Sequence, residues 1–162
     1  MKFIKPMALI ILLVSIISCS PSNNRDEKEI TEVIVEEPVE LSLYDRLGGE
    51  QGISSIVDDI ITKHLANPIV SPQFAYLAND PAKMKQVKKH TCDFLGAGTG
   101  GSEVYTGADV PTVHRGMNIT NEEYLAVVDD ILFVLNDHNV SDQTKKDMLY
   151  ILYSFKGQVV GL

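Results

Sequence analysis

Apolar residues recur at three- and four-residue spacings along most of the chain, and this period constrains the fold more than any other feature. The first such stripe runs from Ile53 to Leu65, and further stripes follow Asp80, Thr120 and Ser141. This spacing places the apolar side chains on one face of a helix. The pattern therefore predicts four substantial helices and no convincing strand, which together define an all-α domain.

Start and stop signals mark the ends of these predicted helices. Asn67-Pro68 should end the first helix, and Asp80-Pro81 combines an N-cap with a proline at the first helical position. Gly96 is the expected stop of that second helix. Thr120 and Glu123 have the spacing of a capping box, and Ser141 should open the last helix.

The N-terminus has the pattern of a secretory signal. Lys2 and Lys5 precede an apolar run over residues 7–17, which is too short to cross a membrane comfortably as a helix. The run ends in Ile-Ile-Ser-Cys, which resembles the lipobox of bacterial lipoproteins. We predict that residues 1–18 are a signal peptide and that Cys19 is lipidated, which holds the protein on the extracytoplasmic side of a cell-envelope membrane. The alternative is a signal anchor whose cysteine is incidental.

The rest of the chain divides into a tether and one domain. Residues 19–40 are rich in Glu, Ser, Asn and Pro and predict an acidic, flexible tether, whereas residues 41–162 form the folded domain. The net charge of −8 and the short basic runs exclude a nucleic-acid-binding surface. Cys92 could pair only with Cys19, so lipidation of Cys19 leaves the domain without a disulfide.

A glycine-rich stretch from Gly96 to Thr112 is longer than a connection between two helices needs to be. Loops of this kind often border a functional site. The stretch contains a formal match to the dinucleotide fingerprint at Gly96, Gly98 and Gly101. That fingerprint requires a strand before it and a helix after it, whereas here a helix precedes it. We therefore interpret the stretch as a site-bordering loop without a dinucleotide.

The chain has four histidines, which differ in their surroundings. His138 lies at a polar helix end, and His64 is expected to pack with partial exposure. His90 stands beside an otherwise apolar helix face. His114 follows the glycine-rich loop at the start of a short helical turn. His90 and His114 are therefore the candidates for binding.

Three kinds of chemistry compete for these two histidines. A zinc site needs at least three ligands, and no nearby spacing completes one. A catalytic pair of Cys92 with His114 is disfavoured because Cys92 lies within an amphipathic helix, as a small core residue does. Haem fits better, since it needs one axial nitrogen and an apolar pocket between helices.

Four co-linear segments carry a resemblance to a known family. LYDRLGG (43–49), GTGGSEVYTG (98–107), VHRGMNIT (113–120) and EEYLAVVDDI (122–131) together resemble the group I truncated haemoglobins. The resemblance covers about residues 41–160. It implies a two-over-two sandwich of helices around haem b, which binds oxygen or another diatomic gas such as nitric oxide or carbon monoxide.

The resemblance also implies roles for individual residues. His114 matches the proximal ligand of the haem iron, Phe74 the phenylalanine that packs against the porphyrin, and Tyr105 a hydroxyl near a haem propionate. The remaining matches to the haem pocket, which are equally consistent with core packing, are Val87, Thr91, Phe94, Leu95, Met117, Ile119, Tyr124 and Val128.

The sequence departs from the family on the distal side. Many members hold oxygen with a tyrosine and a glutamine, and our alignment places Ile61 and Thr91 at those positions. His90 occupies a position where some relatives carry a histidine that acts as a sixth ligand. We hypothesise that His90 and His114 form a six-coordinate haem; in the alternative, His90 faces a propionate or solvent.

Three functions follow from the resemblance. The first is a binding module for diatomic gases. The second is an enzyme that converts nitric oxide to nitrate, or reduces peroxide or nitrite, with electrons from an unidentified reductase. The third is electron transfer or redox sensing through a bis-histidine haem. Ile61 and Thr91 offer little stabilisation to oxygen, so the sequence favours a binding protein over an enzyme.

Overall fold

The computed structural model describes residues 40–162, and in this part of the chain it contains helices and no strand. The predicted signal peptide, Cys19 and nearly all of the predicted tether lie outside the described residues. The helices are α1 (Leu43–Arg46), α2 (Gly49–Ala66), α3 (Ser71–Ala78), α4 (Pro81–Thr99), α5 (Val110–His114), α6 (Asn121–Asp137), α7 (Asp142–Phe155) and a 3₁₀ turn, η1 (Lys156–Gln158). The predicted all-α class is confirmed.

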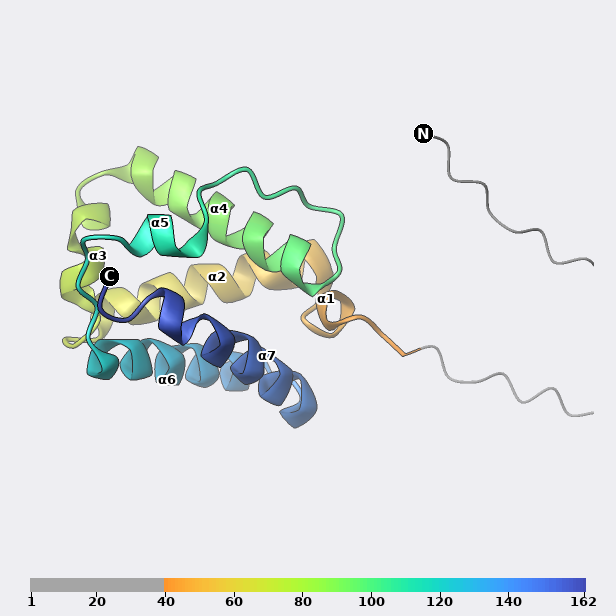
Figure 1. Ribbon diagram of the computed structural model, residues 1–162. Coiled ribbons are helices and arrows are strands. Elements are labelled where there is room, and N and C mark those ends of the chain that lie inside the picture. Colours follow the sequence, from red (N-terminus) through yellow and green to blue (C-terminus); the bar gives the residue numbers. More distant parts are fainter. Residues whose placement is uncertain (1–39) are drawn as a thin grey trace, which may run out of the picture. The chain divides into compact units, whose positions relative to one another are not determined.

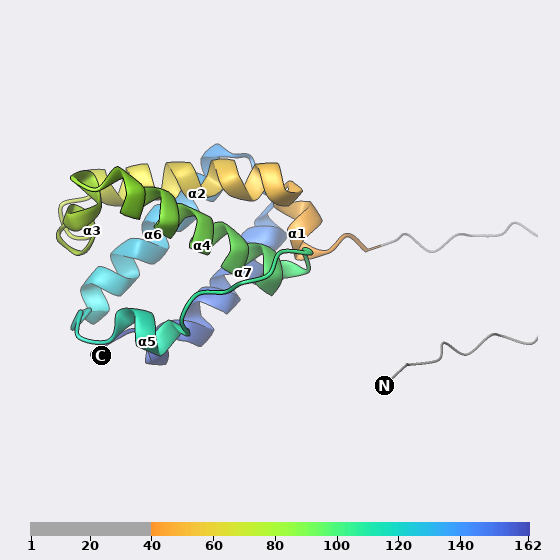
Figure 2. The same ribbon diagram turned by 90° about the horizontal axis from the view of Figure 1, so that it is seen from above.

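The long helices form two layers. α2 packs against α4 in one layer, and α6 packs against α7 in the other, with α2 also in contact with α6 (Figures 1 and 2). This is the two-over-two arrangement that the resemblance implies. The short helices α3 and α5 lie at the end of the layers where the chain finishes (Figure 1). Among residues 40–162, no helix combines the length and the apolar composition needed to cross a bilayer.

The main core lies where α2 meets the second layer. Each large aliphatic side chain that is fully buried there contributes about 1.5–3 kcal/mol through removal of apolar surface from water. The buried residues of this core are Leu47, Ile53, Ile56, Val57, Ile60, Ile61, Ile131, Val134, Leu135 and Met148. The predicted apolar stripes of α2 and α6 therefore face each other, and they fix how the layers stack.

The predicted helix starts are confirmed at the level of their hydrogen bonds. The Asp80 carboxylate accepts the backbone N–H of Lys83, and the Ser141 hydroxyl accepts that of Thr144. Thr120 and Glu123 form a complete capping box, in which each side chain accepts the backbone N–H of the other residue. These bonds satisfy donors that the first turn of a helix leaves unpaired.

The predicted stop at Gly96 is wrong, because α4 continues to Thr99 and ends at Gly100, whose φ is +105°. Glycine in a last turn ends a helix only where the backbone takes the left-handed conformation, and here that position is Gly100. Gly96 serves close packing instead, since a Cβ atom there would lie 2.5 Å from the Glu103 side chain. The following loop is correspondingly shorter, over residues 100–109.

Side-chain hydrogen bonds connect α1, near the start of the domain, to α7, near its end. Arg46 donates from Nη1 to Asp147 Oδ2 at 2.7 Å and to Thr144 Oγ1 at 3.3 Å. Tyr44, also in α1, donates from its hydroxyl to Glu103 Oε1 at 2.7 Å. We name the Arg46 bonds to α7 the α1–α7 clasp.

Gly52 is a position where the fold requires glycine, and Gly52→Ala is expected to lower the free energy of unfolding by about 2 kcal/mol. A Cβ atom at Gly52 would lie 2.1 Å from the Leu47 carbonyl oxygen, so the backbone of α1 would have to move. Denaturant titration measures the change. Gly98→Ala is the control, because nothing lies within 4 Å of its Cβ position. That variant should gain about 0.5–1 kcal/mol from the lower backbone entropy of alanine. Equal stability of the two variants would contradict the prediction.

Candidate functional site

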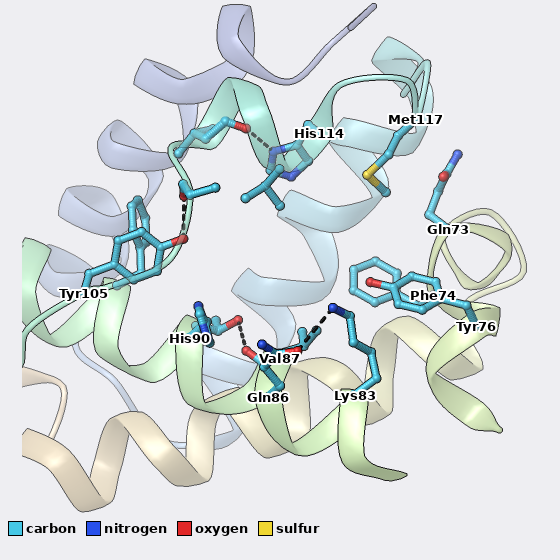
Figure 3. Close-up of a pocket in the computed structure, with 15 residues that line it drawn as sticks. Gln73, Phe74, Tyr76, Lys83, Gln86, Val87, His90, Tyr105, His114 and Met117 are labelled. Carbon is cyan, nitrogen blue, oxygen red and sulfur yellow. Dashed lines mark hydrogen bonds between the residues drawn. The ribbon is translucent and has the colours of Figure 1, made fainter. Parts of the chain in front are cut away.

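A cavity of about 540 Å³ opens between α4, α5 and α3. Figure 3 shows His90 of α4 and His114 of α5 on facing walls of this cavity. The sequence-predicted residues that line it are Phe74, Val87, His90, Thr91, Phe94, Tyr105, His114 and Met117. The structure thus brings most of the predicted site together around one cavity.

A second, smaller cavity of about 210 Å³ shares part of this wall. Phe74, Phe94, His114 and Met117 line both cavities. The smaller cavity extends toward α6 and α7, where it reaches the predicted residues Ile119 and Tyr124 together with Val127, Leu152, Phe155 and Val159. The site therefore continues from the mouth into the apolar interior.

Two predicted pocket residues line neither cavity. Leu95 packs against the core around α2, and Val128 is 3% exposed in a cluster with Ile119, Tyr124 and Val159. The apolar stripe of each helix is wide enough to contact both the core and the cavity. Helical spacing alone therefore does not show which residues pack in the core and which line the cavity.

The large cavity is also lined by residues that the sequence did not predict: Gln73, Tyr76, Lys83, Gln86, Ala108, Val110 and Val113. Lys83 and Gln86 come from α4, where Lys83 donates from Nζ to Gln86 Oε1 at 3.2 Å. Lys83 lies four residues before Val87, and Gln86 lies four residues before His90, so a wider predicted face of α4 would have included them.

His114 is held in one tautomer by the chain. Nδ1 lies 2.8 Å from the Val110 carbonyl oxygen, which can only accept, so Nδ1 carries the proton and Nε2 keeps its lone pair. The Asp109 carboxylate caps α5 by accepting the N–H of Thr112. His114 ends this helix, and the prediction that it begins a helical turn is wrong, because the cap lies five residues earlier.

His90 faces the loop that precedes α5. Its ring meets the Tyr105 ring edge-on, with 6.0 Å between the centroids. Tyr105 is also held in place. Its hydroxyl donates to the Ala108 carbonyl at 2.6 Å, and its ring packs on the Phe94 ring with 5.2 Å between the centroids. The α4 wall and the loop thus form one aromatic corner at the cavity.

Lys83 and Gln86 bring polar groups of α4 to the cavity, whereas Thr91, next to His90, offers little hydrogen bonding there. Thr91 lines the cavity, but its hydroxyl donates to the Val87 carbonyl at 2.9 Å, so its proton is already engaged. Ile61, on α2, is 4% exposed and is part of the hydrocarbon core. His90 is therefore the residue of α4 at this wall with a ring nitrogen suited to a metal.

The remaining two histidines lie away from both cavities. The prediction that His64 is partly exposed is wrong: it is 3% exposed, because Asp130 of α6 supplies a buried partner at 3.0 Å from Nδ1. Burial lowers the pKa of His64 below its ordinary value, against the opposing effect of Asp130. His138 ends α6, as predicted, and lies 2.8 Å from Asp59.

One carboxylate joins the cavity wall to α6. Gln73 donates from Nε2 to Glu123 Oε1 at 2.9 Å, and Glu123 also belongs to the capping box of α6. The hydrogen bond from Gln73, followed by those from Thr120, lowers the pKa of the Glu123 carboxyl. The negative charge of Glu123 thus stays at the N-terminus of α6, where the helix dipole favours it.

Sequence comparisons place the chain among known proteins. The family model described as bacterial-like globin matches residues 42–160. A group 1 truncated hemoglobin of Mycolicibacterium paratuberculosis is 31% identical over 108 residues, which cover 67% of this chain and 76% of that protein. The group 1 truncated hemoglobin of Tetrahymena pyriformis is 30% identical over 119 residues, which cover 67% of this chain and 94% of that protein.

Solved structures agree on the fold. The truncated hemoglobin of Tetrahymena pyriformis in its Fe(III) form superposes with a TM-score of 0.68 at 24% identity, over 75% of this chain and 100% of that chain. The 2/2 hemoglobin of Synechococcus sp. PCC 7002, in the cyanomet state with covalently attached heme, gives 0.66 at 23% identity with the same coverage. The family match and the sequence relatives identify the chain as a bacterial-like globin of the group 1 truncated haemoglobins, and hence as a haem-binding globin.

Proposed function

We propose that haem b binds in the cavity between α4 and α5, with His114 Nε2 as the proximal ligand of the iron. The observation that carries this assignment is the bond from His114 Nδ1 to the Val110 carbonyl. A histidine that ligates a metal usually donates its other N–H in this way, which fixes the ring and raises the basicity of the ligating nitrogen. The apolar walls from Phe74, Val87 and Phe94 suit a porphyrin face.

The residues of the cavity support reversible binding of a diatomic gas, namely oxygen, nitric oxide or carbon monoxide. Bound haem supplies an iron coordination position for the gas and a change of oxidation state. Thr91 engages its proton with the backbone, and Ile61 provides only hydrocarbon, so these positions do not hold a partly negative ligand strongly. This weak stabilisation favours a binding protein over a nitric oxide dioxygenase or a peroxidase.

The position of His90 favours electron transfer or redox sensing as a second function. His90 and His114 lie on facing walls of the cavity (Figure 3), so two imidazoles are available for one iron. A bis-histidine site suits electron exchange with a reductase. The two functions separate in the reduced protein. Spectral change with oxygen and carbon monoxide in the absence of any reductase supports gas binding, whereas no response to either gas supports electron transfer.

The role of His90 is tested by its replacement. We expect the ferric wild-type protein to show a low-spin optical spectrum and His90→Ala a high-spin one, because the variant lacks the sixth imidazole. His138→Ala is the control, since His138 pairs with Asp59 away from both cavities and should leave the spectrum unchanged. A high-spin wild-type spectrum that His90→Ala does not alter would reject the bis-histidine hypothesis.

We also propose that the globin domain is exported and lipid-anchored through Cys19. The lysines, the apolar run and the Ile-Ile-Ser-Cys sequence support this location. Metabolic labelling with palmitate should mark the wild-type protein and leave Cys19→Ser unlabelled, with the label in the membrane fraction. Equal labelling of the two proteins would contradict the anchor.

A further inference from the structure

A polar cluster of His64, Asn67 and Asp130 lies where α2 ends against α6, with His64 and Asp130 buried and Asn67 half-buried. Asp130 Oδ2 lies 3.0 Å from His64 Nδ1 and accepts an N–H from Asn67 Nδ2 at 3.0 Å. His64 is 3% exposed and Asp130 is 5% exposed. We name these three residues the α2–α6 polar cluster.

The hydrogen bonds of this cluster fix the position of the proton on His64. A carboxylate accepts hydrogen bonds, so Nδ1 of His64 is the donor. Burial lowers the pKa of His64, which favours the neutral ring. The ring is therefore held as the Nδ1–H tautomer, with its plane set by Asp130.

The cluster lies beside an apolar core, so the presence of polar side chains there needs an explanation. The core residues next to His64 on α2 include Ile60 and Ile61, and Ile131 follows Asp130 on α6. Apolar side chains of similar volume often stabilise a core as well as a buried polar pair does. What a hydrogen-bonded ring adds is a fixed orientation.

The orientation of His64 is passed to Phe74. The two rings are in contact, with centroids 5.0 Å apart and planes tilted by 40°. Phe74 lines both cavities. No polar atom of Phe74 can hold its ring, so its position depends on the surfaces that pack against it.

The same cluster also fixes the start of α3, the helix that carries Phe74. Asn67 ends α2, and its Oδ1 accepts the backbone N–H of Ile69 at 3.0 Å. Its backbone carbonyl accepts the N–H of Val70 at 3.1 Å and of Ser71 at 2.8 Å. Asn67 thus fixes the backbone before Phe74, and the ring of His64 packs against the ring of Phe74.

We propose that His64 is a positioning residue, which holds the Phe74 ring against the haem through its hydrogen bond to Asp130. This inference rests on the proposed haem site. His64 itself lines neither cavity and acts only through Phe74. The cluster thereby determines how tightly haem is held and in which of its two rotational orientations.

The experiment compares His64→Phe with Val134→Ala in the haem-loaded domain. His64→Phe keeps an aromatic ring but loses the bond to Asp130. Val134→Ala removes buried volume from α6 at a residue that lines neither cavity. The readouts are the rate of haem transfer to excess apomyoglobin and the ratio of the two haem orientations, from the haem methyl signals in the proton NMR spectrum. Urea titration gives the stability of each variant.

We expect His64→Phe to release haem about tenfold faster and to change the orientation ratio, whereas Val134→Ala leaves the rate within about twofold. Phe74→Leu should release haem faster as well. The double variant should lose haem little faster than Phe74→Leu alone, because the effect of His64 passes through that ring.

Two results would overturn the inference, and they lead to different conclusions about the role of Phe74. If Phe74→Leu releases haem faster but His64→Phe behaves like Val134→Ala, His64 is only structural and the proposed haem site stands. If Phe74→Leu releases haem at the wild-type rate, Phe74 does not hold the haem and His64 cannot act through it, whereas failure of the haem site itself would appear as unchanged haem binding in His114→Gly.

A measurement on the wild-type protein keeps the inference testable even if His64→Phe does not fold. A long-range proton–nitrogen NMR spectrum distinguishes a protonated Nδ1 from a protonated Nε2. The Nδ1–H tautomer, persisting in the apoprotein and the haem-loaded protein, supports the orientation by Asp130. The Nε2–H tautomer or a charged ring would overturn it.

Discussion

Replacement of His114 by glycine is expected to remove the proposed axial ligand and to lower the affinity for haem by more than about 100-fold. Even the outer hydrogen-bond partners of a ligating histidine are worth about 10–100-fold in metal affinity, so loss of the ligand itself costs more. The cavity left by the missing ring admits imidazole, which should restore the wild-type optical spectrum. Haem titration with and without imidazole measures both effects.

Two controls make the His114 experiment specific. His138→Gly removes an imidazole that pairs with Asp59 away from both cavities, and it should bind haem as the wild type does. Val110→Ala keeps the carbonyl that holds His114 Nδ1, so ligation should persist. A wild-type spectrum in His114→Gly, with no response to imidazole, would show that another residue ligates the iron.

The second large effect is expected at Asp130, whose replacement by alanine should lower the free energy of unfolding by about 3 kcal/mol. The variant leaves the N–H groups of His64 and Asn67 without their buried acceptor. Each unpaired buried donor costs about 1–3 kcal/mol. Asp129→Ala is the matched control, because the neighbouring Asp129 is exposed and should change stability by less than about 0.5 kcal/mol. Urea titration of both variants checks the prediction.

The same cluster gives the domain a pH dependence with a definite sign. Because burial lowers the pKa of folded His64, the unfolded chain binds more protons once the pH falls below the ordinary value of about 6.5. The stability is therefore fully present above that pH and is lost as the pH falls toward the lowered pKa. Between pH 7.5 and 5.5 the wild type should lose more stability than His64→Asn. Parallel curves for the two proteins would contradict this.

Much of the fold could be predicted from local sequence, because local forces decide it. The apolar period of α2 and α6, and the caps at Asp80, Thr120 and Ser141, act within a few residues and appear as predicted. The errors come from a distant contact and from a backbone conformation that the local pattern does not determine. His64 is buried by Asp130, 66 positions away, and α4 runs past Gly96 because the left-handed residue that ends it is Gly100. The order of residues along one helix shows neither the partner of His64 nor which glycine takes the left-handed conformation.

The candidate site was predictable for a different reason. The motifs around His114 identified the family, and the family arrangement brings Phe74, His90 and Tyr105 to one cavity. Helical spacing did not separate residues that line the cavity from residues that pack behind it, and Leu95 and Val128 line neither cavity. The hydrogen bond from the Thr91 hydroxyl to the Val87 carbonyl could not be predicted either, because the sequence alone does not show whether a hydroxyl donates to the backbone or to the cavity.

The α1–α7 clasp has a mechanical consequence for a protein held by its N-terminal segment. Leu41 and Ser42 lead directly into α1, so tension along that segment enters the domain there. Arg46 passes part of this load to Asp147 and Thr144 of α7, about 100 positions along the chain. If the proposed lipid anchor holds the protein, we expect a pulling force on the N-terminal segment to load the contacts of α1 with α2, α4 and α7 before it reaches α5.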